Sequence, residues 1–157
     1  MDIFSHLEEK DYQNLKSSFS KIAALVGTAD GEMDEKEMEW AKKITRIRTY
    51  AGEDLLFEFY KDVDQDIDEH VLEEVHAFKK DPDKYASLVA EALSQVNMIL
   101  HKVHPKIGAR LYNDLVTYAQ HVAKASGGFM RFFSVSGMER KWVELPMLIP
   151  IIWEEEE

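Results

Sequence analysis

The side chains best suited to bind a cation lie in two separate stretches of the sequence. Asp30, Asp34 and Glu37 are close together near the start of the chain, and Glu139 stands far along it. Carboxylate oxygens are the ligands that calcium and magnesium prefer. If the two stretches pack side by side, these four residues form a candidate metal site for a weakly bound divalent cation. Carboxylates around a metal can also assist hydrolysis, so a metal-assisted hydrolase remains an alternative.

Helix capping accounts for most of the same residues. Asp34 and Glu37 have the spacing of a capping box, in which each side chain accepts a hydrogen bond from the backbone N–H of the other residue. Ser136 and Glu139 repeat that spacing. Capping leaves Asp30 unexplained, so a cation site and a purely structural role both stay open.

A denser acidic run follows in the first half of the chain. Aspartates occupy every second position from Asp62 to Asp68, and Glu73 follows at a spacing that suits an EF-hand calcium loop. Ile67, however, stands where such a loop needs glycine for its sharp turn. We interpret the run as a solvated acidic connector in which Asp66 caps the next helix.

Other patterns that could do chemistry are weaker. His101 and His104 have a spacing that zinc sites use, but further ligands are not nearby in the sequence, and histidines at a helix end that interact with the helix dipole are the more ordinary interpretation. The chain has no cysteine, which excludes thiol catalysis, cysteine zinc sites and disulfides. Nucleophile elbows, phosphate loops and dinucleotide fingerprints are also absent from the sequence. No catalytic residue is predicted.

Helices must position these side chains, because apolar residues recur at helical spacing along most of the chain. The expected helices cover residues 11–26, 34–51, 53–63, 67–78, 82–102 and 105–126, with a last one from 136 that Pro146 and Pro150 kink or end. The pattern predicts an all-α, single-domain bundle of about seven helices over residues 1–157, with its core at about 10–145. The segment 82–102 is apolar over two adjoining stripes, so we expect it to lie centrally.

Two of the predicted helix junctions are alike. One reads Ala-Asp-Gly-x-Met-Asp-x-x-Glu from Ala29 to Glu37, and the other reads Ala-Ser-Gly-Gly-Phe, then Val-Ser-x-x-Glu, from Ala125 to Glu139. The likeness predicts a duplicated helix-loop-helix unit. Glycine adopts positive φ at little cost, so glycines and one capping serine are expected to shape the two loops. These loop-forming residues are Gly31, Gly127, Gly128 and Ser136.

The two junctions resemble the two signatures of TerB-like tellurite-resistance domains. The resemblance covers about residues 10–145. It implies an all-helical bundle that serves tellurite resistance and stress response through metal ions and protein partners, without catalysis. The family's acidic positions fall on the four candidate cation ligands. The chain departs from the family pattern at Ser126, which stands where the counterpart of Asp30 would be, and in the bulky insertion Phe129–Phe133.

Charge and hydropathy limit the partners and the location. The net charge is -11, which disfavours nucleic acid and favours cations or basic proteins. The first residues do not read as a signal peptide, and the longest apolar stretch, Leu145–Trp153, is too short to cross a bilayer. We therefore expect a cytoplasmic protein that is not transmembrane. Its expected partners are proteins, among them a membrane-associated complex or further copies of itself.

These observations favour one function and leave two alternatives. The favoured function is a non-catalytic stress-response module that binds divalent cations or protein partners through its acidic loops. The alternatives are the metal-assisted hydrolase and a purely structural oligomerisation domain. A shallow acidic surface would favour the module, a deep cleft the hydrolase, and a large unpacked apolar face the oligomerisation domain.

Overall fold

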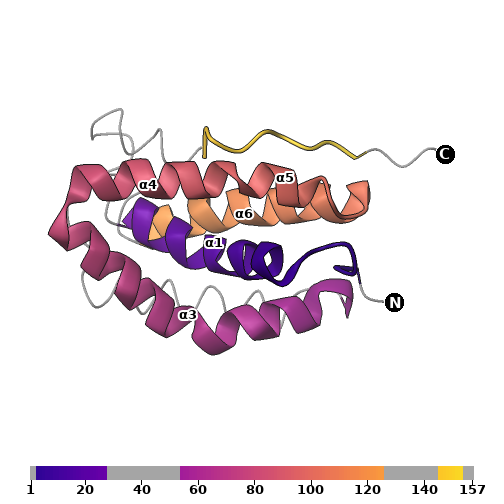
Figure 1. Ribbon diagram of the computed structural model, residues 1–157, viewed down its shortest axis with the longest axis horizontal. Helices are drawn as coiled ribbons and strands as arrows, with labels where there is room; N and C mark the ends of the chain where they lie inside the picture. The colour runs from indigo at the N-terminus through magenta and orange to yellow at the C-terminus, as the bar shows by residue number, and fades with distance from the viewer. Residues whose placement is uncertain (1–2, 28–53, 126–144, 154–157) are drawn as a thin grey trace.

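The computed structural model describes residues 3–27, 54–125 and 145–153 of the chain (Figure 1). The helices in these ranges are α1 (Glu9–Gly27), α3 (Asp54–Lys80), α4 (Pro82–Ser94), α5 (Val96–Leu100) and α6 (Pro105–Ala125). No residue of these ranges lies in a strand, so the all-α class is confirmed for them. The predicted total of seven helices and the duplicated unit depend on residues outside these ranges and stay predictions.

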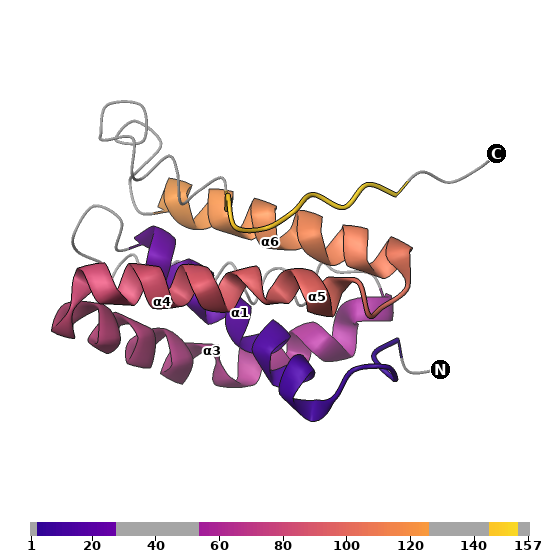
Figure 2. The same cartoon turned by 45° about the horizontal axis from the view of Figure 1, so that its top comes forward.

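Helix α1 lies at the centre of the bundle. It packs against α3 and α6 and also contacts α4 and α5 (Figure 1 and Figure 2). Its predicted apolar stripe is buried at Leu15, Phe19, Ile22 and Val26. The prediction that the segment 82–102 is central is wrong. That segment buries only one side, and Leu88, on its other side, is 55% exposed.

Helix α3 is continuous where the sequence suggested two helices and an acidic connector. The run from Asp62 to Asp68 is helical, so Asp66 lies inside the helix and does not cap one. Apolar residues recur every three or four positions through the run and are buried: Leu56, Phe59, Tyr60, Val63, Ile67, Val71 and Val75. Aspartate in a helix costs roughly 0.7 kcal/mol or less relative to alanine. Burial of the apolar stripe outweighs that cost.

Helix α4 begins as the sequence predicts. Asp81 accepts a hydrogen bond from the backbone N–H of Lys84 at 3.2 Å, and Pro82 is the first helical residue. The predicted single helix to Lys102 is interrupted at Gln95, however, so that α5 forms a separate short helix. Pro105 then opens α6, whose predicted stripe is buried at Ile107, Leu111, Leu115, Tyr118 and Val122.

Residues 145–153 form an extended segment, called here the C-terminal strap, which lies along α5 and α6 (Figure 2). Two of its residues are prolines, which have no backbone N–H to donate within a helix. The strap starts with a turn in which the N–H of Leu148 donates to the carbonyl of Leu145 at 3.0 Å. Both leucines are buried against the bundle, so the strap belongs to the packed structure.

Candidate functional site

The residues predicted from sequence as a cation site lie outside the described ranges. They are the candidate ligands Asp30, Asp34, Glu37 and Glu139 and the loop-forming residues Gly31, Gly127, Gly128 and Ser136. The site therefore stays a prediction. Among the described residues, no three histidine, aspartate or glutamate side chains are grouped so that they could hold a metal ion.

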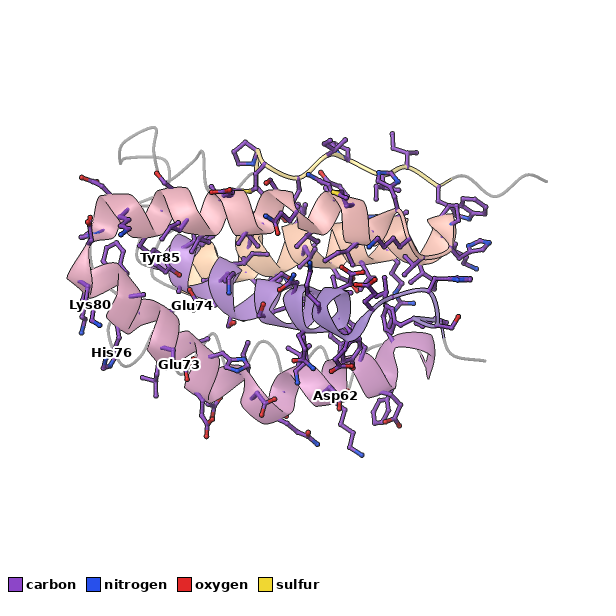
Figure 3. The ribbon with its side chains drawn as sticks, in the orientation of Figure 1. Asp62, Glu73, Glu74, His76, Lys80 and Tyr85 are labelled. Atoms are coloured by element: carbon purple, nitrogen blue, oxygen red, sulfur yellow. The ribbon has the colours of Figure 1, made fainter. Side chains whose placement is uncertain are left out.

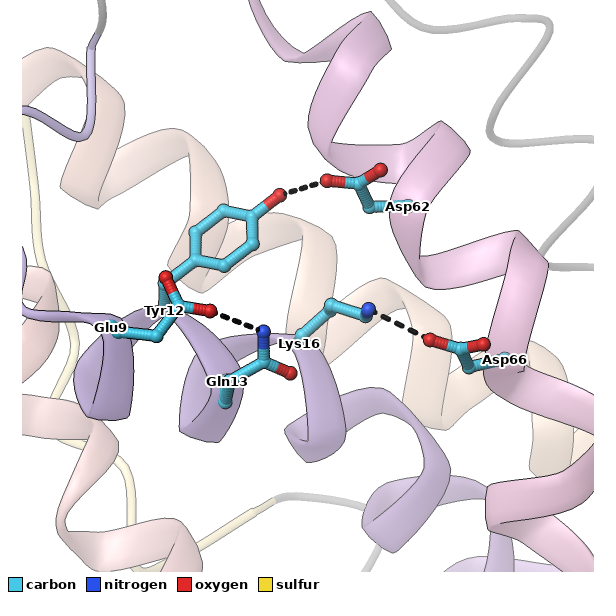
Figure 4. A network of polar contacts seen from close by, with 6 residues as sticks. All are labelled: Glu9, Tyr12, Gln13, Lys16, Asp62 and Asp66. Carbon is cyan, nitrogen blue, oxygen red and sulfur yellow. Dashed lines mark hydrogen bonds and ion pairs between the residues drawn. The ribbon is translucent and has the colours of Figure 1, made fainter.

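The acidic run of α3 is bonded to α1 (Figure 4). The hydroxyl of Tyr12 donates to Asp62 at 2.5 Å, and the ammonium of Lys16 donates to Asp66 at 2.9 Å. In each helix the two partners are four residues apart, so consecutive turns of α1 and α3 face each other. The bond from Lys16 lowers the pKa of Asp66. These two carboxylates thus join the helices and do not form an ion-binding loop.

The same pairing continues along α3 toward its end. Lys21 of α1 donates to Glu74 at 3.0 Å, and Glu74 lies beside the buried hydroxyl of Tyr85 on α4 (Figure 3). Burial raises the pKa of Tyr85, and the negative charge of Glu74 raises it further. On the other side of α3, Tyr60 donates to Asp114 of α6. Hydrogen bonds therefore link α3 to α1 and α6, and Glu74 also lies close to α4.

A third ion pair joins the start of α1 to the turn that follows α5. Lys102 donates to Asp11 at 2.8 Å, and Asp11 is only 5% exposed. The hydrogen bond from Lys102 lowers the pKa of Asp11, and the same bond raises the pKa of Lys102. Sequence analysis missed this pair, because the two residues are 91 positions apart and neither belongs to a recognisable motif.

One hollow of the described surface is open and lies along α3. It has a volume of about 360 Å³, and its described lining consists of Leu72, Glu73, His76, Ala77 and Lys80 (Figure 3). A smaller hollow lies between α1 and α4 and measures about 40 Å³, which is room for little more than one or two water molecules. Neither hollow is a deep, enclosed cleft with convergent carboxylates.

The two histidines at the end of the fifth predicted helix lie at the break between α5 and α6. His101 ends α5 and is exposed. His104 precedes α6, and its Nδ1 accepts a hydrogen bond from the backbone N–H of Lys106 at 3.1 Å. It therefore caps the start of α6, and the expectation that it interacts with the dipole at a helix C-terminus is wrong. Its ring also contacts Trp153, with ring centroids 5.4 Å apart.

Asn97 of α5 holds the C-terminal strap by its backbone. Its side-chain nitrogen donates to the carbonyl of Met147 at 2.9 Å, and its side-chain oxygen accepts from the N–H of Ile149 at 2.8 Å. Further along, Ile151 packs close to Gly108 of α6. The strap is thus fixed at two points to the α5–α6 face. Sequence analysis missed this contact too, since a lone asparagine in a helix gives no signal of a distant partner.

Three large apolar side chains of the strap are exposed to solvent. Ile149 is 61% exposed, Ile152 is 83% exposed and Trp153 is 42% exposed. We call these three residues the C-terminal apolar edge. Exposed apolar side chains that gather on one surface segment are a feature of surfaces that contact another molecule.

Comparison of the chain with protein-family models, with curated proteins and with solved structures found no match. The resemblance to TerB-like domains therefore rests on the two junction motifs alone. Within the described ranges, no helix combines the length and the apolar character that a membrane crossing requires.

Proposed function

We propose that this chain is a non-catalytic, cytoplasmic binding module of the TerB-like, stress-response kind. In this proposal it binds a divalent cation at the acidic loops around Asp30 and Glu139. It also docks onto partner proteins through a surface of its helical bundle.

The C-terminal apolar edge is the observation that carries the proposal. Most large apolar side chains of the described residues are buried in one continuous core, yet Ile149, Ile152 and Trp153 stay exposed on a segment that Asn97 holds in place. Full burial of a large apolar side chain is worth about 1.5–3 kcal/mol, and these three side chains forgo the part of it that corresponds to their exposed surface. Contact with a partner would recover that free energy, so the edge supports a binding function.

The use of the carboxylates supports binding over catalysis. On α3, Asp62, Asp66 and Glu74 bond to donors of α1 and do not converge on an enclosed cleft. One oxygen of each of these carboxylates is bonded in holding the helices together. A metal-assisted hydrolase would instead need carboxylates around an open coordination position.

Thermal unfolding with and without calcium or magnesium tests the cation part of the proposal. With a Kd of about 1 mM, 10 mM of the ion would add about 1.4 kcal/mol to the free energy of unfolding, which raises the Tm by about 3–6 °C for a domain of this size. The variant Asp30→Asn with Glu139→Gln should lose that rise. Asp62→Asn is the matched control. This substitution should change the Tm measured without the ion, but the rise in Tm on adding the ion should remain.

Two results would contradict the cation site. One is a wild-type Tm that neither ion changes. The other is an equal rise in the double variant, which would mean that the ion binds elsewhere and that Asp30 and Glu139 have structural roles only.

A further inference from the structure

We propose that the C-terminal apolar edge docks an amphipathic helix of a partner protein, whose apolar stripe is bordered by lysine or arginine. This inference rests on the proposed binding function and names the surface and the class of partner. Three properties of the strap lead to it: its fixed backbone, the dimensions of its exposed side and the charge that follows it.

The backbone of the strap is fixed before any partner arrives. Leu145 and Leu148 are buried, and Asn97 bonds to the carbonyl and N–H groups on either side of Leu148. The ring of Trp153 rests against His104. Because the segment is already ordered, docking costs little additional conformational entropy. A free tail with the same side chains would lose much more on binding.

The exposed side of the strap suits a helix and not a deep pocket. With its inward side chains anchored, the strap cannot enter a groove of another protein, so it offers a shallow apolar surface. An extended backbone from Ile149 to Trp153 spans at most about 13 Å. Two turns of an α-helix cover about 11 Å, and helices bind apolar surfaces through side chains at positions i, i+3, i+4 and i+7. The lengths therefore match.

The negative charge of this chain favours a partner helix with basic residues beside its apolar stripe. Four glutamates, Glu154–Glu157, follow Trp153 directly, and the whole chain has a net charge of -11. Lysine and arginine beside the apolar stripe would be attracted to this tail, and acidic residues would be repelled. The same charge disfavours an anionic membrane surface and a second copy of this chain, whose acidic tails would approach each other.

The test follows the indole N–H resonance of Trp153 in the full-length protein, assigned by its loss in Trp153→Phe. The first probe is a designed amphipathic helix with a leucine stripe and lysine flanks, and the second has the same stripe with glutamate flanks. At physiological salt we expect a saturable shift of the Trp153 resonance with the lysine peptide only. Ile149→Ser and Ile152→Ser should each weaken that binding at least tenfold.

Matched controls use exposed apolar residues on other elements. Leu72 of α3 is 43% exposed and Leu88 of α4 is 55% exposed, so Leu72→Ser and Leu88→Ser remove similar apolar area away from the strap. Both variants should bind the lysine peptide like the wild type. Equal losses in these controls would show that the peptide binds the acidic surface at large, and would overturn the proposal.

Three other results would also overturn it. They are an equal response to the glutamate peptide, a dimer in sedimentation that Ile152→Ser abolishes, and a larger shift with phosphatidylserine vesicles than with the lysine peptide. None of these measurements involves Asp30 or Glu139. If calcium stabilises the protein but the lysine peptide does not bind, this inference is refuted and the cation part of the proposed function stands.

Discussion

Replacement of Gly108 by alanine tests the packing of α5 against α6. Gly108 lies in the first turns of α6, and a Cβ atom added there would stand 2.6 Å from the carbonyl oxygen of Leu100. That oxygen belongs to the backbone, so it cannot rotate away as a side chain could. Either α5 or α6 must shift. The side chain of Ile151 is also near, at 3.7 Å from the added atom, which is an ordinary contact.

Two opposing effects set the size of the change in the free energy of unfolding. In an exposed helix position, alanine is favoured over glycine by about 1 kcal/mol. Overpacking of a closely packed contact costs about 1–3 kcal/mol, and a contact with a rigid backbone oxygen belongs at the upper end of that range. We therefore expect Gly108→Ala to lower the free energy of unfolding by about 1–2 kcal/mol, despite the better helix former.

Urea unfolding of the wild type and of Gly108→Ala measures this difference directly. The control is Asn113→Ala, because Asn113 is exposed on the same helix and gains helix propensity with no close contact. That variant should be as stable as the wild type or slightly more stable. If Gly108→Ala also raises the free energy of unfolding, α5 and α6 do not approach each other as closely as the structure shows, and the reasoning fails.

Three further predictions concern polar groups. Asn97→Ala should lower the unfolding free energy by about 1–3 kcal/mol and abolish hydrogen-exchange protection of the Ile149 N–H, while exchange elsewhere stays unchanged. The pKa of Asp11 is lowered in the folded state. Its contribution to the free energy of unfolding is therefore present above the unfolded pKa of about 3.9 and is lost as the pH falls further. When the free energy of unfolding is measured at several pH values, Asp11→Asn should show a smaller decrease at acid pH than the wild type. Tyr85 has a raised pKa and, among the described residues, no hydrogen-bond partner of normal geometry. Tyr85→Phe should therefore change the unfolding free energy by less than about 1 kcal/mol and make it less sensitive to pH above about 10; a large destabilisation would mean that the hydroxyl is bonded.

Much of the helical architecture follows from local signals in the sequence. The stripe of α1 from Leu15 to Val26 has the 3.6-residue period of an amphipathic helix and is buried. Asp81 caps α4 and Pro82 fixes the φ of its first residue. Pro105 likewise fixes φ at the first residue of α6. Such signals act within a few residues, so they can be recognised without knowledge of the neighbours.

The acidic run of α3 shows where local signals mislead. Aspartates at alternate positions are typical of solvated connectors, yet the apolar residues among them keep helical spacing across the run. The two signals conflict locally. Burial of the stripe against α1, together with the bonds from Tyr12 and Lys16, decides for the helix. Sequence alone does not show that α1 offers these donors at the matching turns.

By itself the sequence determined the helical class, the starts of α4 and α6, and the buried faces of α1 and α6, because periodicity and caps are local properties. The cation site around Asp30 stays a prediction from sequence. Only the tertiary structure decided the contacts between distant segments: Asp11 with Lys102, and Asn97 with the strap. A hydrogen bond between residues 50 or 91 positions apart leaves no pattern in either segment. Its formation depends on where the packed helices bring the two groups.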